Sequence, residues 1–197
     1  MKDFLSYVPP KSSKLLQCWV DELNVNIKLT APRQSKLGDF QVKDNKFYIT
    51  INYNLNQYSF LITLTHELAH AFVFKKYQYE LKPHSKSWQL TFKALMLNFL
   101  NLDCFPDDIL KVLSLHMIKP KASTFSDLNL VKVLMQYDKN KVFTLSDLSL
   151  GDVFSLASGR TFIKGKILRK RIKCIEKSTD KYYSLHPFTE VIIKDKC

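Results

Sequence analysis

The chain has 197 residues, of which 46% are hydrophobic, and it carries 30 Lys and Arg against 18 Asp and Glu, a net charge of +12. This length and apolar content predict one globular domain, or one domain with a small appendage, and exclude a disordered chain. The basic surplus favours a polyanionic partner, nucleic acid rather than membrane, although many soluble proteins are basic without binding any polyanion.

Several classes of protein are disfavoured by what the sequence lacks. Its four glycines are too scattered to form a phosphate-binding loop. No apolar run approaches the roughly 20 residues of a membrane-spanning helix, and the N-terminus lacks an apolar stretch of signal-peptide length. The cysteines form no CxxC pair, which suits a reducing compartment; they are Cys18, Cys104, Cys174 and Cys197. We therefore expect a cytoplasmic protein without a membrane partner.

The first half of the chain alternates helical and extended patterns. In order, we predict a helix over residues 14–23, a strand over 25–30, a hairpin over 39–52 that turns at Asp44–Asn45, a long helix over 57–79 and another helix over 87–100. The long helix is apolar on nearly every side, which is typical of a buried helix, and Pro83 lies beyond its end.

The second half changes in texture beyond about residue 140. Residues 106–137 are predicted to form short helices, interrupted at Pro120 and around 123–126. Strands are predicted after residue 145: a hairpin over 152–164, a strand over KILRKRIKCIEK (166–177) and another over YYSL (182–185). The expected organisation is therefore an α+β domain over 1–140 and a small all-β module over 141–197.

The string HELAH, residues 66–70, lies inside the predicted long helix. Residues four apart on a helix stack one turn above each other, so the His66 and His70 imidazoles can converge on one zinc ion. Glu67 projects in a neighbouring direction and could accept a proton from water bound to that zinc. The pattern predicts a zinc-dependent peptidase in which Glu67 is the general base.

Two alternatives compete with this interpretation. An HExxH string arises by chance in roughly one sequence in three hundred of this composition, and a buried His is more often a core residue than a ligand. Burying a carboxylate and two imidazoles in so apolar a helix would, however, cost several kcal/mol without partners. A metal ion removes most of that cost, so we favour zinc.

A catalytic zinc site needs a third protein ligand. His84 follows Pro83 where the chain turns back toward the long helix, so we favour it. Glu80 lies more than two turns past His70, which is too far along the same helix. The other candidates downstream are Asp103, Asp107 and His116.

The segment from residue 49 to 90, with HELAH followed by Pro-His-x-Lys-x-Trp at 83–88, resembles the SprT-like family, which includes bacterial SprT and the Spartan-type zinc metallopeptidases. The resemblance implies a zincin-like core with a short antiparallel sheet beside the HExxH helix. It also implies one zinc held by His66, His70 and His84, with Glu67 as the catalytic acid-base. Active relatives are DNA-stimulated proteases that act on proteins crosslinked to DNA.

The C-terminal module departs from the family pattern. Many relatives end in a zinc ribbon with paired cysteines, but only Cys174 and the terminal Cys197 remain here, so we expect a module without zinc. A basic stretch with aromatic neighbours could instead contact nucleic acid, including single strands; its cations are Arg160, Lys164, Lys166, Arg169, Lys170, Arg171 and Lys173. A solvated strand face would explain the same charges.

Three functions follow as hypotheses. The first is a zinc peptidase that hydrolyses proteins at or near DNA, with a possible role in repair of DNA–protein crosslinks. The second is a nucleic-acid-associated factor, of the kind linked to transcription elongation, in which the zinc is structural and proteolysis is negligible. The third is a zinc hydrolase for a non-peptide amide. No functional role is assigned to His116 or His186.

Overall fold

The computed structural model describes residues 3–33, 36–78, 82–121, 123 and 126–193. It divides into two compact units, residues 1–139 and 140–197, so that the boundary falls one residue before the predicted one. Each unit has its own hydrophobic core. None of the helices in the described ranges is both long and apolar enough to cross a membrane.

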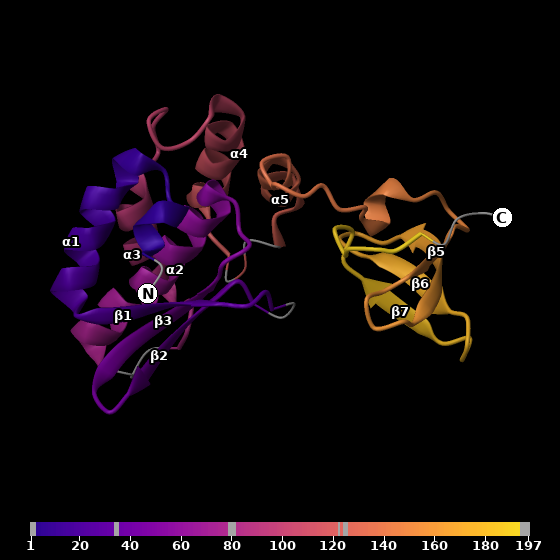
Figure 1. Ribbon diagram of the computed structural model, residues 1–197, viewed down its shortest axis with the longest axis horizontal. Coiled ribbons are helices and arrows are strands. Elements are labelled where there is room, and N and C mark those ends of the chain that lie inside the picture. Colours follow the sequence, from indigo (N-terminus) through magenta and orange to yellow (C-terminus); the bar gives the residue numbers. More distant parts are fainter. Residues whose placement is uncertain (1–2, 34–35, 79–81, 122, 124–125, 194–197) are drawn as a thin grey trace. The chain divides into compact units, whose positions relative to one another are not determined.

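The first unit begins with two short 3-10 turns, η1 (Phe4–Tyr7) and η2 (Pro10–Ser12), and helix α1 (Ser13–Leu23). A three-stranded sheet follows in the order β1-β3-β2, built from β1 (Val25–Thr30), β2 (Gly38–Lys43) and β3 (Lys46–Asn52). The helices that follow the sheet in the first unit are α2 (Gln57–Tyr77), α3 (Lys86–Leu97), α4 (Asp107–Ile118) and α5 (Leu128–Met135). Figure 1 shows the sheet running along one side of α1, α2 and α3.

The sheet is mixed, which corrects the predicted antiparallel arrangement. Strands β2 and β3 form the expected antiparallel hairpin, and its two-residue turn places Asp44 and Asn45 at φ 49° and 56°. This left-handed pair is the geometry that suits a tight hairpin, and Asp and Asn tolerate it. Strand β1, however, pairs in parallel with β3. Strand β2 therefore forms an edge of the sheet, on the side where α2 packs.

Helix α2 is the centre of the first unit. Asn56 caps its start, because the Asn56 side chain accepts hydrogen bonds from the backbone N–H groups of Tyr58 and Ser59. The helix packs against α1, α3, β2 and β3, and residues on nearly all of its faces are buried. Because other elements cover α2 on nearly all sides, its sequence has no polar face. The uniform apolar pattern correctly predicted a buried helix.

The second unit is a four-stranded antiparallel sheet in the order β4-β5-β6-β7, preceded by the 3-10 turn η4 (Leu145–Asp147). Its strands are β4 (Val153–Ser155), β5 (Thr161–Ile167), β6 (Ile172–Glu176) and β7 (Tyr182–Leu185). The predicted strand over 166–177 is wrong in one respect: it breaks at 168–171, where a tight turn joins β5 to β6. The molecule is thus a mixed α+β protein with a C-terminal antiparallel sheet.

Candidate metal centre

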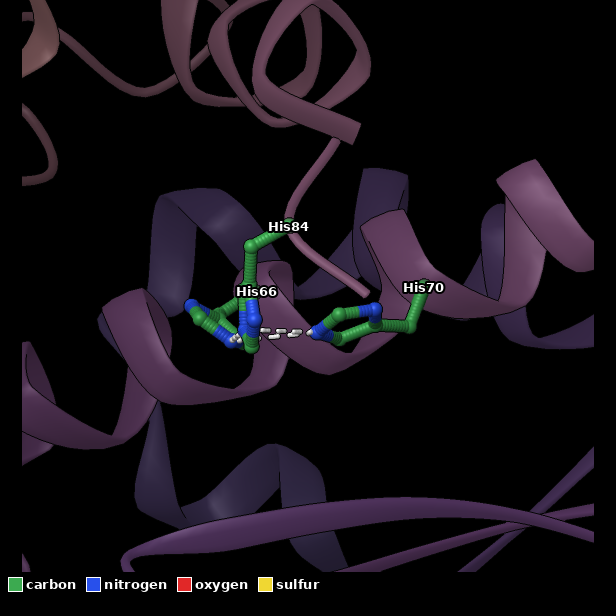
Figure 2. A group of neighbouring side chains, drawn as sticks. All are labelled: His66, His70 and His84. Carbon is green, nitrogen blue, oxygen red and sulfur yellow. Dashed lines mark hydrogen bonds between the residues drawn. The ribbon is translucent and has the colours of Figure 1, made fainter. Parts of the chain in front are cut away.

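Three histidine side chains meet on one side of α2. His66 and His70 stand one turn apart on the helix, and His84 reaches them from the segment before α3, as Figure 2 shows. The Nε2 atom of His84 lies 3.1 Å from Nε2 of His66 and 3.1 Å from Nε2 of His70, and the last two atoms are 3.3 Å apart. The three nitrogens form a nearly equilateral triangle, and they are the group in the described residues that could hold a metal ion.

His84 can face α2 because of the backbone around it. The residue has φ 59°, a left-handed conformation that reverses the chain between the two helices. Ser85 precedes the first residue of α3, and its backbone oxygen accepts a hydrogen bond from the N–H of Gln89. Of the other ligand candidates, Asp107 forms an ion pair with Lys111, and His116 is buried against Asp127. Asp103 is exposed, and Glu80 lies outside the described residues.

Trp88 lies behind the three imidazoles. Its ring centroid is 4.5 Å from that of His66, 4.7 Å from His84 and 5.2 Å from His70, and the residue is 1% exposed. Its Nε1 donates to the backbone oxygen of His66 at 3.4 Å. Because α3 holds this indole against all three rings, Trp88 restricts their rotation. The sequence places Trp88 in the motif at 83–88 but does not indicate that it supports the three histidines.

Burial keeps the imidazoles neutral. Desolvation lowers the pKa of His66 to about 2 and that of His70 to about 4, and repulsion among the rings adds to both effects. The pKa of His84 is lowered by the same desolvation. A neutral imidazole has a free nitrogen lone pair, which is the form that binds metals.

Glu67 points toward strand β2. The carboxylate accepts a hydrogen bond from the backbone N–H of Phe40, and the residue is only 7% exposed. Desolvation, reinforced by the negative charge of Asp39, raises the pKa of Glu67 to about 8. A buried carboxyl with a pKa near neutrality can both take up and return a proton at physiological pH.

Gly38 allows β2 to approach Glu67 this closely. A Cβ atom on Gly38 would lie 2.7 Å from Cγ2 of Thr63 and 2.9 Å from both Cγ and Oε1 of Glu67. Gly38 was not among the predicted site residues. A signal was present, however, because it is the single glycine in the first 150 residues.

The loop before Gly38 is fixed by a polar network on β3. Arg33 donates to the side chains of Asn52 at 2.9 Å and Thr50 at 3.0 Å. Asn52 is 1% exposed and donates in turn to the backbone oxygens of Arg33 and Lys36. These bonds tie the two ends of the loop to β3 and so set the position of Gly38 beside Glu67.

A protein family matches the part of the chain that carries these residues. The model of the SprT-like family matches residues 14–104, slightly less than half of the chain. These residues belong to the SprT-like family. The SprT-like segment contains all three histidines, Glu67, Gly38 and Trp88, and it ends before α4. Among curated proteins and solved structures, no match to the chain was found.

The cations of the second unit, outside the SprT-like segment, have unequal surroundings. Lys164 is 6% exposed, and its ammonium donates to the backbone oxygen of Leu148, so it is used inside the unit. Arg160 is exposed, but it forms an ion pair with Glu176 and stacks over two aromatic rings. The remaining predicted contacts are exposed: three lie in the β5–β6 connection, one in β5 and one in β6. They are Arg169, Lys170 and Arg171, Lys166, and Lys173.

Proposed function

We propose that the chain is a zinc-dependent metallopeptidase of SprT-like type with a zincin-like core. The observation that carries this proposal is the triangle of neutral imidazoles from His66, His70 and His84, on the helix that also carries the buried carboxyl of Glu67. Three protein ligands and a general base are the parts that zinc-assisted hydrolysis requires.

The triangle fits zinc in size as well as in chemistry. Three ligands at zinc–nitrogen distances of about 2.05 Å in tetrahedral arrangement have nitrogens about 3.3 Å apart. The Nε2 separations of 3.1–3.3 Å match that value. All three side chains are partly exposed, so a fourth position can be reached by water or substrate. A purely structural zinc site would be closed by a fourth protein ligand.

The bound zinc would polarise a peptide carbonyl and lower the pKa of a water molecule to about 7. Glu67 would accept the proton of the attacking water at its carboxylate and deliver it to the nitrogen of the departing amine. The hydrogen bond from the Phe40 N–H holds the Glu67 carboxylate in place between these two transfers. Trp88 keeps the imidazoles oriented throughout.

The second unit supports a location near nucleic acid. Exposed cations at the β5–β6 turn can neutralise phosphates, and Tyr182, 63% exposed beneath the ammonium of Lys173, offers a ring for base stacking. Proteins bound or crosslinked to DNA would then be the substrates, in the cytoplasm.

The decisive experiment compares Glu67→Gln with Glu190→Gln, a control at an exposed glutamate of the second unit. Zinc content is measured by atomic emission, and cleavage of an unfolded protein is followed with and without single-stranded DNA. We expect one zinc per chain in every form and loss of cleavage only in Glu67→Gln. Equal cleavage by Glu67→Gln and the parent would refute the role of Glu67.

One observation favours the alternative of a structural zinc in a nucleic-acid-associated factor. Glu67 is 7% exposed and packed against β2, so a substrate has little direct access to its carboxylate. This alternative predicts that the parent protein binds zinc and DNA but never cleaves itself or an unfolded substrate under either condition. The same assay therefore distinguishes the two functions.

A further inference from the structure

A small apolar pocket lies beside the start of α2. Its floor is formed by buried residues of α2 and α5, and its rim by half-buried ones. The cavity measures about 90 Å³, and its wall is mostly apolar; the lining residues are Leu37, Leu55, Ser59, Ile62, Thr63, Val131, Leu134, Met135 and Asp138. An apolar cavity of about 150 Å³ holds a benzene molecule, so one of this size suits a single branched or linear aliphatic side chain.

The pocket and the Glu67 carboxyl lie along the same side of α2. Ser59, Thr63 and Glu67 are spaced four apart, so they form one row along α2. Thr63 lines the pocket, and a Cβ at Gly38 would touch both Thr63 and Glu67. Leu37, on the opposite wall, immediately precedes Gly38. Helix α2 and the segment Leu37–Gly38 thus line the pocket from two sides, and the same two segments enclose the Glu67 side chain.

The separation fits an extended peptide. With a rise of 1.5 Å per residue, Thr63 and Ser59 lie about 6 and 12 Å along the helix axis from Glu67. An extended peptide advances about 3.3 Å per residue. A side chain in the pocket would therefore belong to a residue about two to four positions from the cleaved bond.

The pocket is preformed by a bridge between α2 and α5. The amide of Asn56 donates to the backbone oxygen of Leu134 at 2.9 Å and to the carboxylate of Asp138 at 2.7 Å, while its oxygen caps α2. The bridge fixes the two helices that form the floor. It also holds the Asp138 carboxylate at the rim, where its negative charge disfavours an acidic substrate residue.

We propose that this pocket is a specificity site that binds one aliphatic side chain of the peptide substrate, such as that of Leu or Met. The inference rests on the proposed peptidase function and deepens it, because it assigns a sequence preference to that function. Binding a Leu side chain instead of Ala buries about three more carbon atoms, which corresponds to a preference of about ten- to a hundredfold.

Binding and cleavage are tested separately on the full-length, zinc-loaded chain. The probes are fluorescent ten-residue peptides of Ala and Ser with one variable central residue: Leu, Ala, Asp or Lys. Affinity is measured by anisotropy on the Glu67→Gln variant, which requires no turnover. Cleavage sites in a peptide digest made by the parent protein are mapped by mass spectrometry.

We expect the Leu peptide to bind at least tenfold more tightly than the Ala and Asp peptides. We also expect aliphatic residues to be enriched at one position within four of the cleaved bond. Ser59→Phe, which fills the pocket from its rim, should reduce the affinity for the Leu peptide to that for the Ala peptide. Gln57→Phe places the same ring on an exposed position of α2 and should leave the Leu preference unchanged.

If Ser59→Phe fails to fold, Met135→Trp fills the pocket from α5, with exposed Gln136→Trp as its control. Equal affinity for the Leu and Ala peptides, a preference for Lys drawn by Asp138, or a Leu preference that survives both filling variants would overturn the proposal. Leu-selective binding without any cleavage would instead leave the pocket in place and refute the peptidase function.

Discussion

At the scale of single residues, the site depends on charged and polar groups placed where water is scarce. His66 and Glu67 are consecutive in the chain, yet burial shifts their pKa values in opposite directions, to about 2 and about 8. Both shifts favour the neutral form, because desolvation penalises whichever form is charged. Without a metal, the folded chain therefore keeps both groups uncharged at neutral pH, at a cost in stability.

That cost predicts how Glu67→Gln changes stability with pH. In metal-free protein, Glu67 has a pKa of about 8 when folded and about 4.5 when unfolded. Between these values the unfolded state releases a proton that the folded state retains, so stability falls as pH rises through this window. Glutamine does not titrate, so Glu67→Gln does not lose stability in this way. The histidines change the stability of both proteins with pH by the same amount. We expect Glu67→Gln to be more stable than the parent at pH 8, by on the order of a few kcal/mol.

Urea unfolding in the presence of a chelator, at intervals from pH 5 to 8, measures this difference. The gap between the two proteins should widen steadily as pH rises. A gap that stays constant over the range would show that the Glu67 carboxyl is not desolvated as described.

Trp88 gives a second prediction at this scale. Because its indole contacts all three imidazoles, Trp88→Phe should weaken zinc binding by about ten- to a hundredfold, the usual effect of removing an outer support of metal ligands. Trp19→Phe is the matched control, since Trp19 packs on Phe72 and Phe99. Zinc affinities are compared by competition with a chromophoric chelator. Equal losses in the two variants would point to general destabilisation.

At the scale of elements, the sequence predicted those helices and strands whose formation depends on the local pattern of residues. The buried helix α2, the β2–β3 hairpin with its turn at Asp44–Asn45 and the helix that carries Trp88 were all predicted within a few residues. The parallel pairing of β1 with β3 was not, because strand partners far apart in the chain are set by packing rather than by local pattern. The pocket between α2 and α5 was missed for the same reason.

The close contact between β2 and α2 gives a prediction at this scale. In Gly38→Ala, the added methyl group would lie under 3.0 Å from Thr63 and Glu67, so strand and helix must separate or Glu67 must move. Overpacking of this kind costs about 1–3 kcal/mol. We expect a lower unfolding midpoint and a larger loss of peptidase activity than the stability change explains, while zinc content is retained.

Gly165→Ala serves as a comparison for this variant, because its methyl group would clash with the backbone of Lys173 in the second unit. Both variants should be destabilised, but only Gly38→Ala should lose activity under conditions where the protein remains folded. Full activity in folded Gly38→Ala would contradict the proposed placement of Glu67 by β2.

At the scale of the whole molecule, the chain combines a unit that carries the candidate metal centre with a basic unit. The sequence indicated both, but it could not distinguish among the cations of the second unit. In the sequence of β5, Lys164 follows the apolar Ile163, as an exposed strand residue would. Its ammonium nevertheless bonds to Leu148 beside η4, a contact set only by the folded arrangement.

The surroundings of these cations predict which of them contribute to nucleic-acid affinity. Arg169, Lys170 and Arg171 are exposed at the β5–β6 turn, where three positive charges can each neutralise a phosphate. Replacing all three with Ser in the full-length protein should weaken binding to duplex DNA. It should also reduce the slope of log K against log salt by about 2 to 3, because each lost phosphate contact removes about 0.9. The loss should be similar for all DNA sequences, since contacts to phosphate do not read bases.

A matched triple variant separates this local effect from net charge. Lys11, Lys14 and Lys28 are exposed in the first unit, so replacing them with Ser removes the same charge elsewhere. Binding is measured by anisotropy over a range of salt concentrations, and cleavage of an unfolded protein is measured without DNA. We expect the decrease in slope in the turn variant alone, and DNA-free cleavage to persist in both variants. Equal slopes in the two variants would mean that the +12 charge of the chain acts diffusely rather than through the turn.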